Sequence, residues 1–224
     1  GQAPLSAIGR KLPGLKPFPP LSGPGVDIPS TPAALWLWLR GDDRGELLLR
    51  SRHIEQALAP VFRLQESCDG FKHDTGRDLT GYEDGTENPT GEAATAAAIA
   101  ADGSSLVAVQ RWLHNFSRFD AMQPEDRDNC IGRRRSDNEE LDDAPESAHV
   151  KRTAQESFSP EAFLLRRSMP WADGMEAGLM FVAFGHTLDA FQAQMRRMIG
   201  LEDGIVDALF RFTRPVSGAY FWCP

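Results

Sequence analysis

Residues 178–199 read GLMFVAFGHTLDAFQAQMRRMI, and the apolar pattern changes from one kind to another within this stretch. Its first part, Gly178 to Phe184, is a short continuous apolar run, which is typical of a buried strand. From Thr187 to Ile199 the apolar residues recur every three or four positions, which places them on one face of a helix. They are Leu188, Phe191, Met195 and Met198. The stretch therefore predicts a strand that leads into an amphipathic helix.

The residues around this stretch extend the pattern into an order of elements. Apolar runs predict further strands, and helical spacing predicts further helices. In the second half, strands are predicted at Ser105–Phe116, Ala162–Ser168, Gly178–Phe184 and Gly218–Trp222, and helices at Pro124–Ile131, Thr187–Ile199 and near Val206–Phe212. The order strand, helix, strand, strand, helix, strand is typical of the ferredoxin-like unit. We therefore predict an α+β fold with antiparallel sheets.

The first half looks like the later part of a second such unit. Strands are predicted at Ala33–Leu39 and Phe62–Phe71, and helices at Leu47–Ala59 and Glu92–Ala101. No repeat is found at the level of residues, so the predicted duplication concerns the architecture alone. We expect a duplicated ferredoxin-like fold of the dimeric α/β-barrel type. Residues 1–102 would form what remains of the first half, and residues 103–224 would form the second.

The amino end of the chain differs from an ordinary start. The chain opens with Gly1-Gln2-Ala3-Pro4 instead of a methionine, and then enters a stretch rich in proline and glycine, Pro13 to Pro32. A loop of this length without structure is uncommon in a compact domain. We therefore expect that preceding residues are missing and that the first half is truncated at its N-terminus.

Composition and charge exclude several classes of function. The 24 basic and 32 acidic side chains give a formal net charge of −8, which argues against binding to nucleic acid or to an anionic membrane. The three cysteines, Cys68, Cys130 and Cys223, are far apart and odd in number. This pattern favours buried thiols in a reducing compartment over a disulfide framework or a zinc site. We expect a cytoplasmic protein.

The run Gly81-Tyr82-Glu83-Asp84-Gly85-Thr86-Glu87-Asn88-Pro89 is the most distinctive loop in the chain. Two glycines surround Asp84, and glycine allows both unusual backbone angles and the close approach of a ligand. This pattern suits an acid that takes part in chemistry. Taken alone, however, Asp84 is more probable as a turn residue, because Asp and Gly are common turn formers.

Two further candidates are a histidine and a pair of arginines. The five histidines do not show the close spacing of a zinc site, but a haem needs only one axial histidine from the protein. His149 is such a candidate, although on its own it would be taken as a surface residue. Arg166 and Arg167 end a predicted strand, so their side chains are expected on opposite faces.

The order of these motifs resembles that of the dye-decolorising peroxidases, a haem peroxidase family, and most closely its bacterial, intracellular-type branch. The resemblance spans about residues 60 to 224 and is carried by these blocks in order: GYEDGTENP (81–89), QRWLHN (110–115), IGRRR (131–135), AHVKR (148–152), LLRRSMP (164–170) and FTRPVSGAYF (212–221). It implies that the second half binds haem b, iron protoporphyrin IX. It also implies a peroxidase that reduces hydrogen peroxide and oxidises dyes or phenolic and other aromatic substrates through a ferryl intermediate.

The resemblance assigns roles to particular residues. Asp84 matches the distal aspartate and Arg166 the distal arginine, the two implied catalytic residues. His149 matches the proximal ligand of the haem iron. The further cofactor-binding residues that it implies are Arg133 (a haem-propionate partner), Ser168 (in the distal pocket), Asp207 (an acceptor for the proximal imidazole), and the loop residues Glu83, Gly85, Thr86, Glu87 and Asn88 along one haem edge.

These residue types suit the chemistry of peroxide. Splitting the O–O bond unevenly requires a proton to move between the two oxygens, and Asp84 can carry it. Arg166 can stabilise the charge that develops on the leaving oxygen. The imidazole of His149 is a better electron donor if its other nitrogen donates to a carboxylate such as Asp207.

Several alternatives and partners stay open. The chain could instead handle haem, by porphyrin deferrochelation or haem transfer, or be a cofactor-free ferredoxin-like binding module. Trp112, Trp171 or Tyr220 could carry electrons from bulky dyes if they reach the surface, although core packing is the commoner role of such residues. The expected partners are hydrogen peroxide and an aromatic reductant, a homo-oligomer of two or more copies, and an encapsulating shell.

Overall fold

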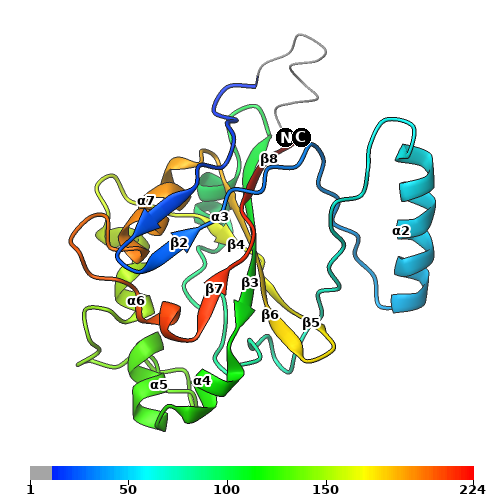
Figure 1. Ribbon diagram of the computed structural model, residues 1–224. Helices are drawn as coiled ribbons and strands as arrows, with labels where there is room; N and C mark the ends of the chain where they lie inside the picture. The colour runs from blue at the N-terminus through cyan, green and yellow to red at the C-terminus, as the bar shows by residue number, and fades with distance from the viewer. Residues whose placement is uncertain (1–11) are drawn as a thin grey trace.

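A computed structural model describes residues 12–224 and is built around one antiparallel sheet (Figure 1). Its two central strands are β3 (Ser105–His114) and β6 (Glu176–Gly185), which pair from Leu106↔Gly185 to Leu113↔Gly178. β6 also pairs with β4 (Leu165–Arg166) and β5 (Met169–Asp173). β3 pairs on its other side with β7 (Thr213–Pro215) and β8 (Ala219–Cys223).

The order of the strands is that of the predicted ferredoxin-like unit. Across the sheet, β8 lies beside β3, β3 beside β6, and β6 beside β4 and β5. In chain order this is fourth, first, third, second, and every pair is antiparallel. The prediction of an α+β fold with an antiparallel ferredoxin-like sheet is confirmed for the second half.

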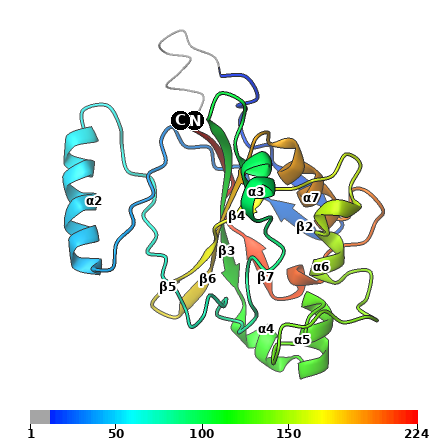
Figure 2. The same cartoon turned by 180° about the vertical axis from the view of Figure 1, so that it is seen from behind.

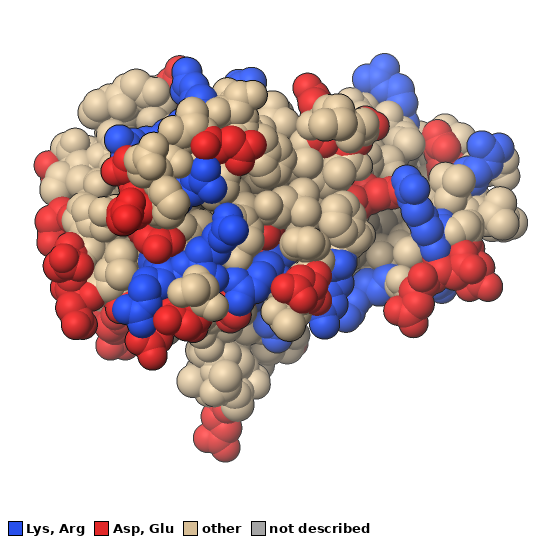
Figure 3. Space-filling view, turned by 90° about the horizontal axis from the view of Figure 1, so that it is seen from below, with Lys and Arg blue, Asp and Glu red and all other residues tan. Residues whose placement is uncertain are grey.

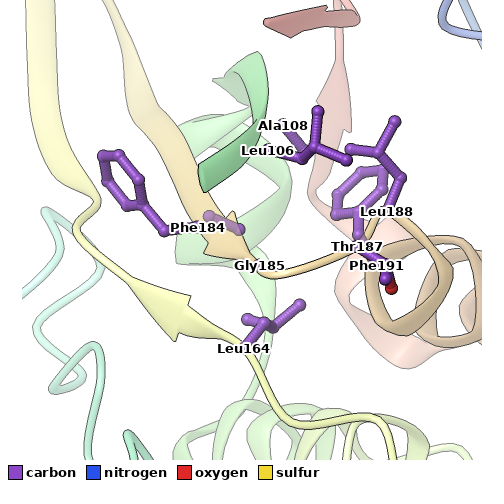
Figure 4. A pocket seen from close by; sticks show the side chains of 9 residues that line it. Leu106, Ala108, Leu164, Phe184, Gly185, Thr187, Leu188 and Phe191 are labelled. Carbon is purple, nitrogen blue, oxygen red and sulfur yellow. The ribbon is translucent and has the colours of Figure 1, made fainter. Parts of the chain in front are cut away.

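One face of the sheet packs against helix α7 (Asp189–Met198). The core between them contains Leu106 and Ala108 from β3, Ala183 from β6, and the predicted helix face of Leu188, Phe191, Met195 and Met198. Figure 4 shows a pocket in this layer, with Leu106, Leu188 and Phe191 on one side of β6 and Phe184 pointing to the other. Because its lining is almost entirely apolar, we interpret this pocket as core.

The opposite face of the sheet is covered by an extended segment of the chain. Trp36 stacks on Phe221 of β8, and Trp38 stacks on Phe184 of β6. The strand predicted at Ala33–Leu39 is therefore wrong: the segment has no strand. The segment crosses this face of the sheet with its indole rings packed against the strands. Its backbone therefore does not lie beside the edge of a strand.

The strand predicted at Phe62–Phe71 is also wrong. Only Gly70 pairs with the sheet, through an isolated bridge to Trp171. Leu64 and Phe71 are exposed, so the apolar residues of this segment do not form a buried strand. The strand predicted at Ala162–Ser168 forms, but it is shortened to β4 because only Leu165 and Arg166 pair with β6.

The remaining elements lie around the sheet, with α2 on the side away from α7 in both ribbon views (Figures 1 and 2). The helices are α2 (Arg44–Leu58), α3 (Gly91–Ala98), α4 (Phe116–Ala121), α5 (Pro124–Ile131) and α6 (His149–Arg152), with short 3-10 turns η1 (Gln155–Ser157) and η2 (Ala208–Arg211). A small hairpin, β1 (Leu21–Gly23) and β2 (Val26–Ile28), was not predicted. It lies within the proline- and glycine-rich stretch, where Gly25 has a φ of +74°.

The first half is described in part. Residues 1–11, including the opening Gly1-Gln2-Ala3-Pro4, lie outside the described residues. Residues 12–102 contain the β1–β2 hairpin, α2 and α3. The division into two halves, the duplication and the truncation stay predictions. Within residues 12–224, no helix is both long and apolar enough to cross a membrane.

Three aromatic residues take the commoner of their two predicted roles, core packing, whereas two of the three cysteines are less buried than predicted. Trp112, Trp171 and Tyr220 are buried in the core, so they do not reach the surface. The three cysteines are free, but only Cys130 is buried, whereas Cys68 is half-buried and Cys223 exposed. Burial raises the pKa of Cys68 to about 11, which keeps its thiol protonated.

Candidate functional site

Asp84 lies at the end of a short hairpin that spans residues 76–84. The backbone N–H of Asp78 donates to Tyr82 O (2.8 Å), Arg77 is bridged to Glu83, and Asp84 N–H donates to Gly76 O (3.5 Å). At the tip, Gly81 N–H donates to Asp78 O and closes a tight turn. Gly81 has a φ of +89°, a backbone conformation that residues other than glycine rarely adopt. The first glycine of the motif therefore forms the turn of the hairpin that leads to Asp84.

The loop that follows Asp84 is held by residues from distant parts of the chain. Asn138 Nδ2 donates to both Glu83 (3.1 Å) and Thr86 (3.0 Å). Gln155 Nε2 donates to the backbone oxygen of Glu87 (2.7 Å). These contacts give the loop one defined path, which is a condition for presenting Asp84 in one place.

Asn88 joins this loop to β4 at Arg166. Its amide Nδ2 donates to Arg166 O (3.0 Å), and Arg166 N–H donates back to Asn88 Oδ1 (2.8 Å). The same amide fills the space beside Gly85, where a Cβ would lie 2.8 Å from Asn88 Nδ2. Gly85 also has a φ of +76°. The second glycine of the motif is therefore required by the contact that connects the loop to Arg166.

The two neighbouring arginines point to opposite faces, as predicted. Arg166 is half-buried, whereas Arg167 is exposed. The buried Nε of Arg166 and the buried Oγ of Ser168 have no hydrogen-bond partner among residues 12–224. Buried polar groups are normally satisfied, so two such atoms on one short segment indicate a site for a further group.

His149 begins α6 and contacts a fully buried carboxylate. Its Nδ1 lies 2.8 Å from Asp207 Oδ2, and the Asp207 side chain is 0% exposed. Asp207 Oδ1 also accepts from Leu209 N–H (2.8 Å). Because Nδ1 faces an acceptor, the Nε2 atom is the one left to bind a metal. The predicted contact between His149 and Asp207 is therefore present.

An ion pair between buried Arg152 and exposed Asp203 fixes the other end of α6. Arg152 donates from NH1 and NH2 to the two carboxylate oxygens of Asp203, each at 2.7 Å, and from NH2 to Arg197 O. The backbone N–H of Ala208 donates to Ser147 O, just before α6. Both contacts hold α6 against the region that carries Asp207.

Arg133 lies in a network of charges. Its NH2 contacts Glu87 and lies 3.0 Å from Glu140, and its NH1 donates to Asn138 O. Figure 3, a view from below, shows basic side chains in a band with acidic side chains along it. Arg133 is thus bound to loop residues in this structure, and its predicted contact with a haem propionate stays a prediction.

Gln155 and Asn138 were not among the predicted site residues, although both hold the loop. Gln155 is 3% exposed; its Nε2 donates to Glu87 O, and its Oε1 accepts from Leu164 N–H just before β4. Glutamine and asparagine are usually exposed, so a single sequence has no signal that marks buried Gln155 and half-buried Asn138 as connectors.

Four polar groups from three segments of the chain remain free for a ligand. They are the Asp84 carboxylate, Arg166 Nε, Ser168 Oγ and His149 Nε2, none of which has a hydrogen bond or ion pair within residues 12–224. An axial imidazole backed by a carboxylate, together with a free acid and a cation, is a donor set that fits haem. The residues present therefore fit the cofactor that the sequence resemblance implied.

The ferredoxin-like sheet and this set of free groups together define a class of protein that binds a metal-containing cofactor beside the sheet. Similarity to known proteins identifies the family within this class. A family model described as Dyp-type peroxidase, C-terminal, matches residues 75–224. A dye-decolorizing peroxidase from Rhodococcus erythropolis is 32% identical over 222 residues, which cover 94% of this chain and 65% of that protein. The chain belongs to the Dyp-type peroxidase family.

Solved structures agree with this assignment. A DypB variant from Rhodococcus jostii RHA1, solved in complex with heme, has a TM-score of 0.91 and 30% identity and is matched over 100% of this chain and 76% of its own. A dye-decolorizing protein from V. cholerae has a TM-score of 0.84 and 31% identity, over 96% and 74%. The chain spans about two thirds of the length of the curated relative from R. erythropolis.

Proposed function

We propose that this chain is the haem-binding part of a peroxidase that reduces hydrogen peroxide and oxidises dyes or phenolic aromatic compounds. The observation that carries the proposal is the His149–Asp207 pair, in which a fully buried carboxylate leaves Nε2 of the imidazole free. Membership of the Dyp-type peroxidase family supports it.

The residues that would hold haem b are His149, through Nε2, the loop 83–88, Arg166, Ser168 and Arg133. When bound, the haem supplies a redox-active iron that reacts with peroxide. Asp207 holds a proton on Nδ1 of His149, which orients the ring and increases its basicity.

Asp84 and Arg166 would act on the peroxide. The Asp84 carboxylate takes the proton from one peroxide oxygen and returns it to the oxygen that leaves as water. The Arg166 guanidinium stabilises the charge that develops on that leaving oxygen. The Asn88 side chain bonds both the backbone oxygen and the backbone N–H of Arg166. It therefore holds the loop that follows Asp84 against Arg166.

The test compares His149→Ala with His53→Ala, a change at an exposed histidine on α2. The expected result is that His149→Ala no longer shows a Soret band after haem titration, whereas His53→Ala binds haem and oxidises a dye with peroxide as the unchanged chain does. A full Soret band in His149→Ala would contradict the assigned ligand. Release of iron-free protoporphyrin from bound haem, without dye oxidation, would favour the haem-handling alternative.

The assembly and location of the protein are finer proposals. Family membership supports a homo-oligomer and an encapsulating shell as partner, and the spacing of the cysteines supports a cytoplasmic location. Light scattering of the purified chain at several concentrations tests the first of these, with a mass of two or more copies expected.

A further inference from the structure

His114, at the end of β3, connects the hairpin of Asp84 to the sheet and has no part in the function proposed above. The ring is buried, with Nε2 3.0 Å from Asp78 Oδ1 in the hairpin and Nδ1 2.7 Å from Thr213 Oγ1 in β7. The rings of Phe116, in α4, and Phe212, after η2, lie edge-on against it.

The hydrogen bonds around His114 determine how many protons it carries. Thr213 Oγ1 donates its single hydrogen to Leu113 O (3.1 Å), so this oxygen can only accept from Nδ1–H. On the other side, Asp78 Oδ2 accepts from both Thr80 N–H (3.0 Å) and Thr80 Oγ1 (2.5 Å). A proton shared between Nε2 and Asp78 belongs on the imidazole, because a carboxyl is the stronger acid by more than about two pKa units.

The charge state of Asp78 agrees with this count. Burial by itself raises the pKa of Asp78, but the hydrogen bond and charge of His114 and the two hydrogen bonds from Thr80 lower it below its usual value. A carboxylate buried beside a doubly protonated ring forms an ion pair, which is a stronger contact than a neutral hydrogen bond.

We propose that His114 is an imidazolium whose ion pair with Asp78 clamps the Asp84 hairpin to β3 and β7, so that His114 is a positioning residue for Asp84. The inference rests on the proposed role of Asp84. The hairpin is short, and a second anchor acts on its other strand, where Tyr82 OH donates to Asp128 of α5 (2.5 Å). With both anchors in place, the position of Asp84 depends on the sheet and not only on its own loop.

The protonation state is tested first, on the haem-free chain, by nitrogen-detected NMR of the histidine rings at neutral pH. The expected spectrum shows hydrogen on both ring nitrogens of His114, which is recognised by its contacts to Phe116 and Phe212. An unprotonated nitrogen in His114 would overturn the ion pair. This result is independent of haem binding, so it is separate from any failure of the proposed peroxidase function.

The positioning role is tested by a double-mutant cycle on the haem-loaded protein. His114→Gln should slow the reaction with peroxide by roughly tenfold, as expected for a small displacement of a catalytic group. In an Asp84→Asn background the same change should have less than about a twofold effect, since the positioned group is gone. Equal factors in both backgrounds would overturn the role. If His114→Gln does not fold, Thr213→Val replaces it in the cycle; this change removes the acceptor of Nδ1–H together with the donor to Leu113 O.

Discussion

At the scale of single residues, Arg166 at the end of β4 and Arg167 directly after it differ in a way that suits different tasks. Arg166 is half-buried, has a buried Nε without a partner, and is joined to the Asp84 loop by Asn88. Arg167 is exposed, and its NH1 donates to Arg166 O (3.1 Å). Strand alternation explains the difference, because neighbouring side chains on a strand face opposite sides.

Arg166→Leu is therefore expected to bind haem but to react with peroxide at a rate lower by a factor of about 100 or more. Removal of one stabilising donor has an effect of that size in other enzymes. Arg167→Leu is the matched control and should react within about twofold of the unchanged chain, because an exposed cation is screened by solvent. Stopped-flow absorbance of the Soret band after mixing with peroxide measures both. Equal rates in the two variants would contradict the distal role of Arg166.

At the scale of elements, Gly132 of the IGRRR block, directly after α5, determines how closely α5 packs against α6. Gly132 ends α5 with a φ of +91°, and a Cβ there would lie 2.2 Å from Val150 Cγ2. Val150 follows His149 directly, so a shift of the α6 backbone that relieves this contact also moves the histidine. The glycine of this block thus acts on His149 through the packing of α5 against α6.

Gly132→Ala should lower both stability and haem affinity. The left-handed backbone costs about 1–2 kcal/mol for alanine, and overpacking against Val150 adds about 1–3 kcal/mol. Gly103→Ala is the control, since Gly103 has a φ of +85° but nothing lies within 4 Å of its Cβ position. Urea unfolding and haem titration of the two variants separate backbone strain from the contact. Unchanged haem affinity in Gly132→Ala would refute the link to His149.

The hairpin before Asp84 makes a second prediction, on the pH dependence of stability. Asp78→Asn is expected to lower the free energy of unfolding at pH 7 by about 3 kcal/mol, because it breaks a buried ion pair. The pKa of Asp78 is lowered in the folded state, so its stabilising effect is present above the unfolded value of about 3.9 and is lost as pH falls through the folded value. The difference between variant and unchanged chain should therefore shrink below about pH 4.

Asp102→Asn is the control for this measurement. Asp102 accepts the same pair of hydrogen bonds, from Ser104 N–H and Oγ, but it is exposed and has no histidine partner. Its replacement should have a much smaller effect at every pH. Denaturant unfolding between pH 3 and pH 7 measures both, and equal effects of the two variants would show that the turn, and not the ion pair, stabilises the hairpin.

At the scale of the whole molecule, the sheet is covered very differently on its two faces. Helix α7 buries Phe191, Gln194, Met195 and Met198 against one face. Helix α2 lies on the other side of the molecule (Figure 2). It has no buried residue, and its Leu48 and Leu49 are 61% and 68% exposed. Most helical stability in proteins comes from packing, so the two helices should differ in stability.

Hydrogen exchange should show this difference directly. Among the longer helices, α2 is expected to have the amides that exchange fastest. The amides of β3 should exchange slowest, because β3 has strands on both sides and is covered on both faces of the sheet. Helix α7 is the control, with slow exchange expected from its buried face. Protection of α2 equal to that of β3, measured by mass spectrometry on the chain in solution, would contradict this picture.

Local patterns predicted the elements whose signal lies within a few residues. The helix at Pro124–Ile131 was predicted with the bounds that the structure shows, because a proline starts it and a glycine ends it. The strands β3 and β6 and the helix α7 follow from apolar runs and from three- and four-residue spacing. The strands predicted at Ala33–Leu39 and Phe62–Phe71 failed, because a strand also needs a partner edge, and local composition does not encode one.

The sequence by itself determined the ferredoxin-like order of the second half, the family resemblance, and the choice of Asp84, His149 and Arg166 as candidates. The tertiary structure decided which residues meet. It joins His149 to Asp207 across 58 positions and Asn88 to Arg166 across 78, and it makes His114 a connector between Asp78 and Thr213. The physical reason is that periodicity and turn formation are local, whereas buried hydrogen bonds and ion pairs depend on segments that only the folded sheet brings together.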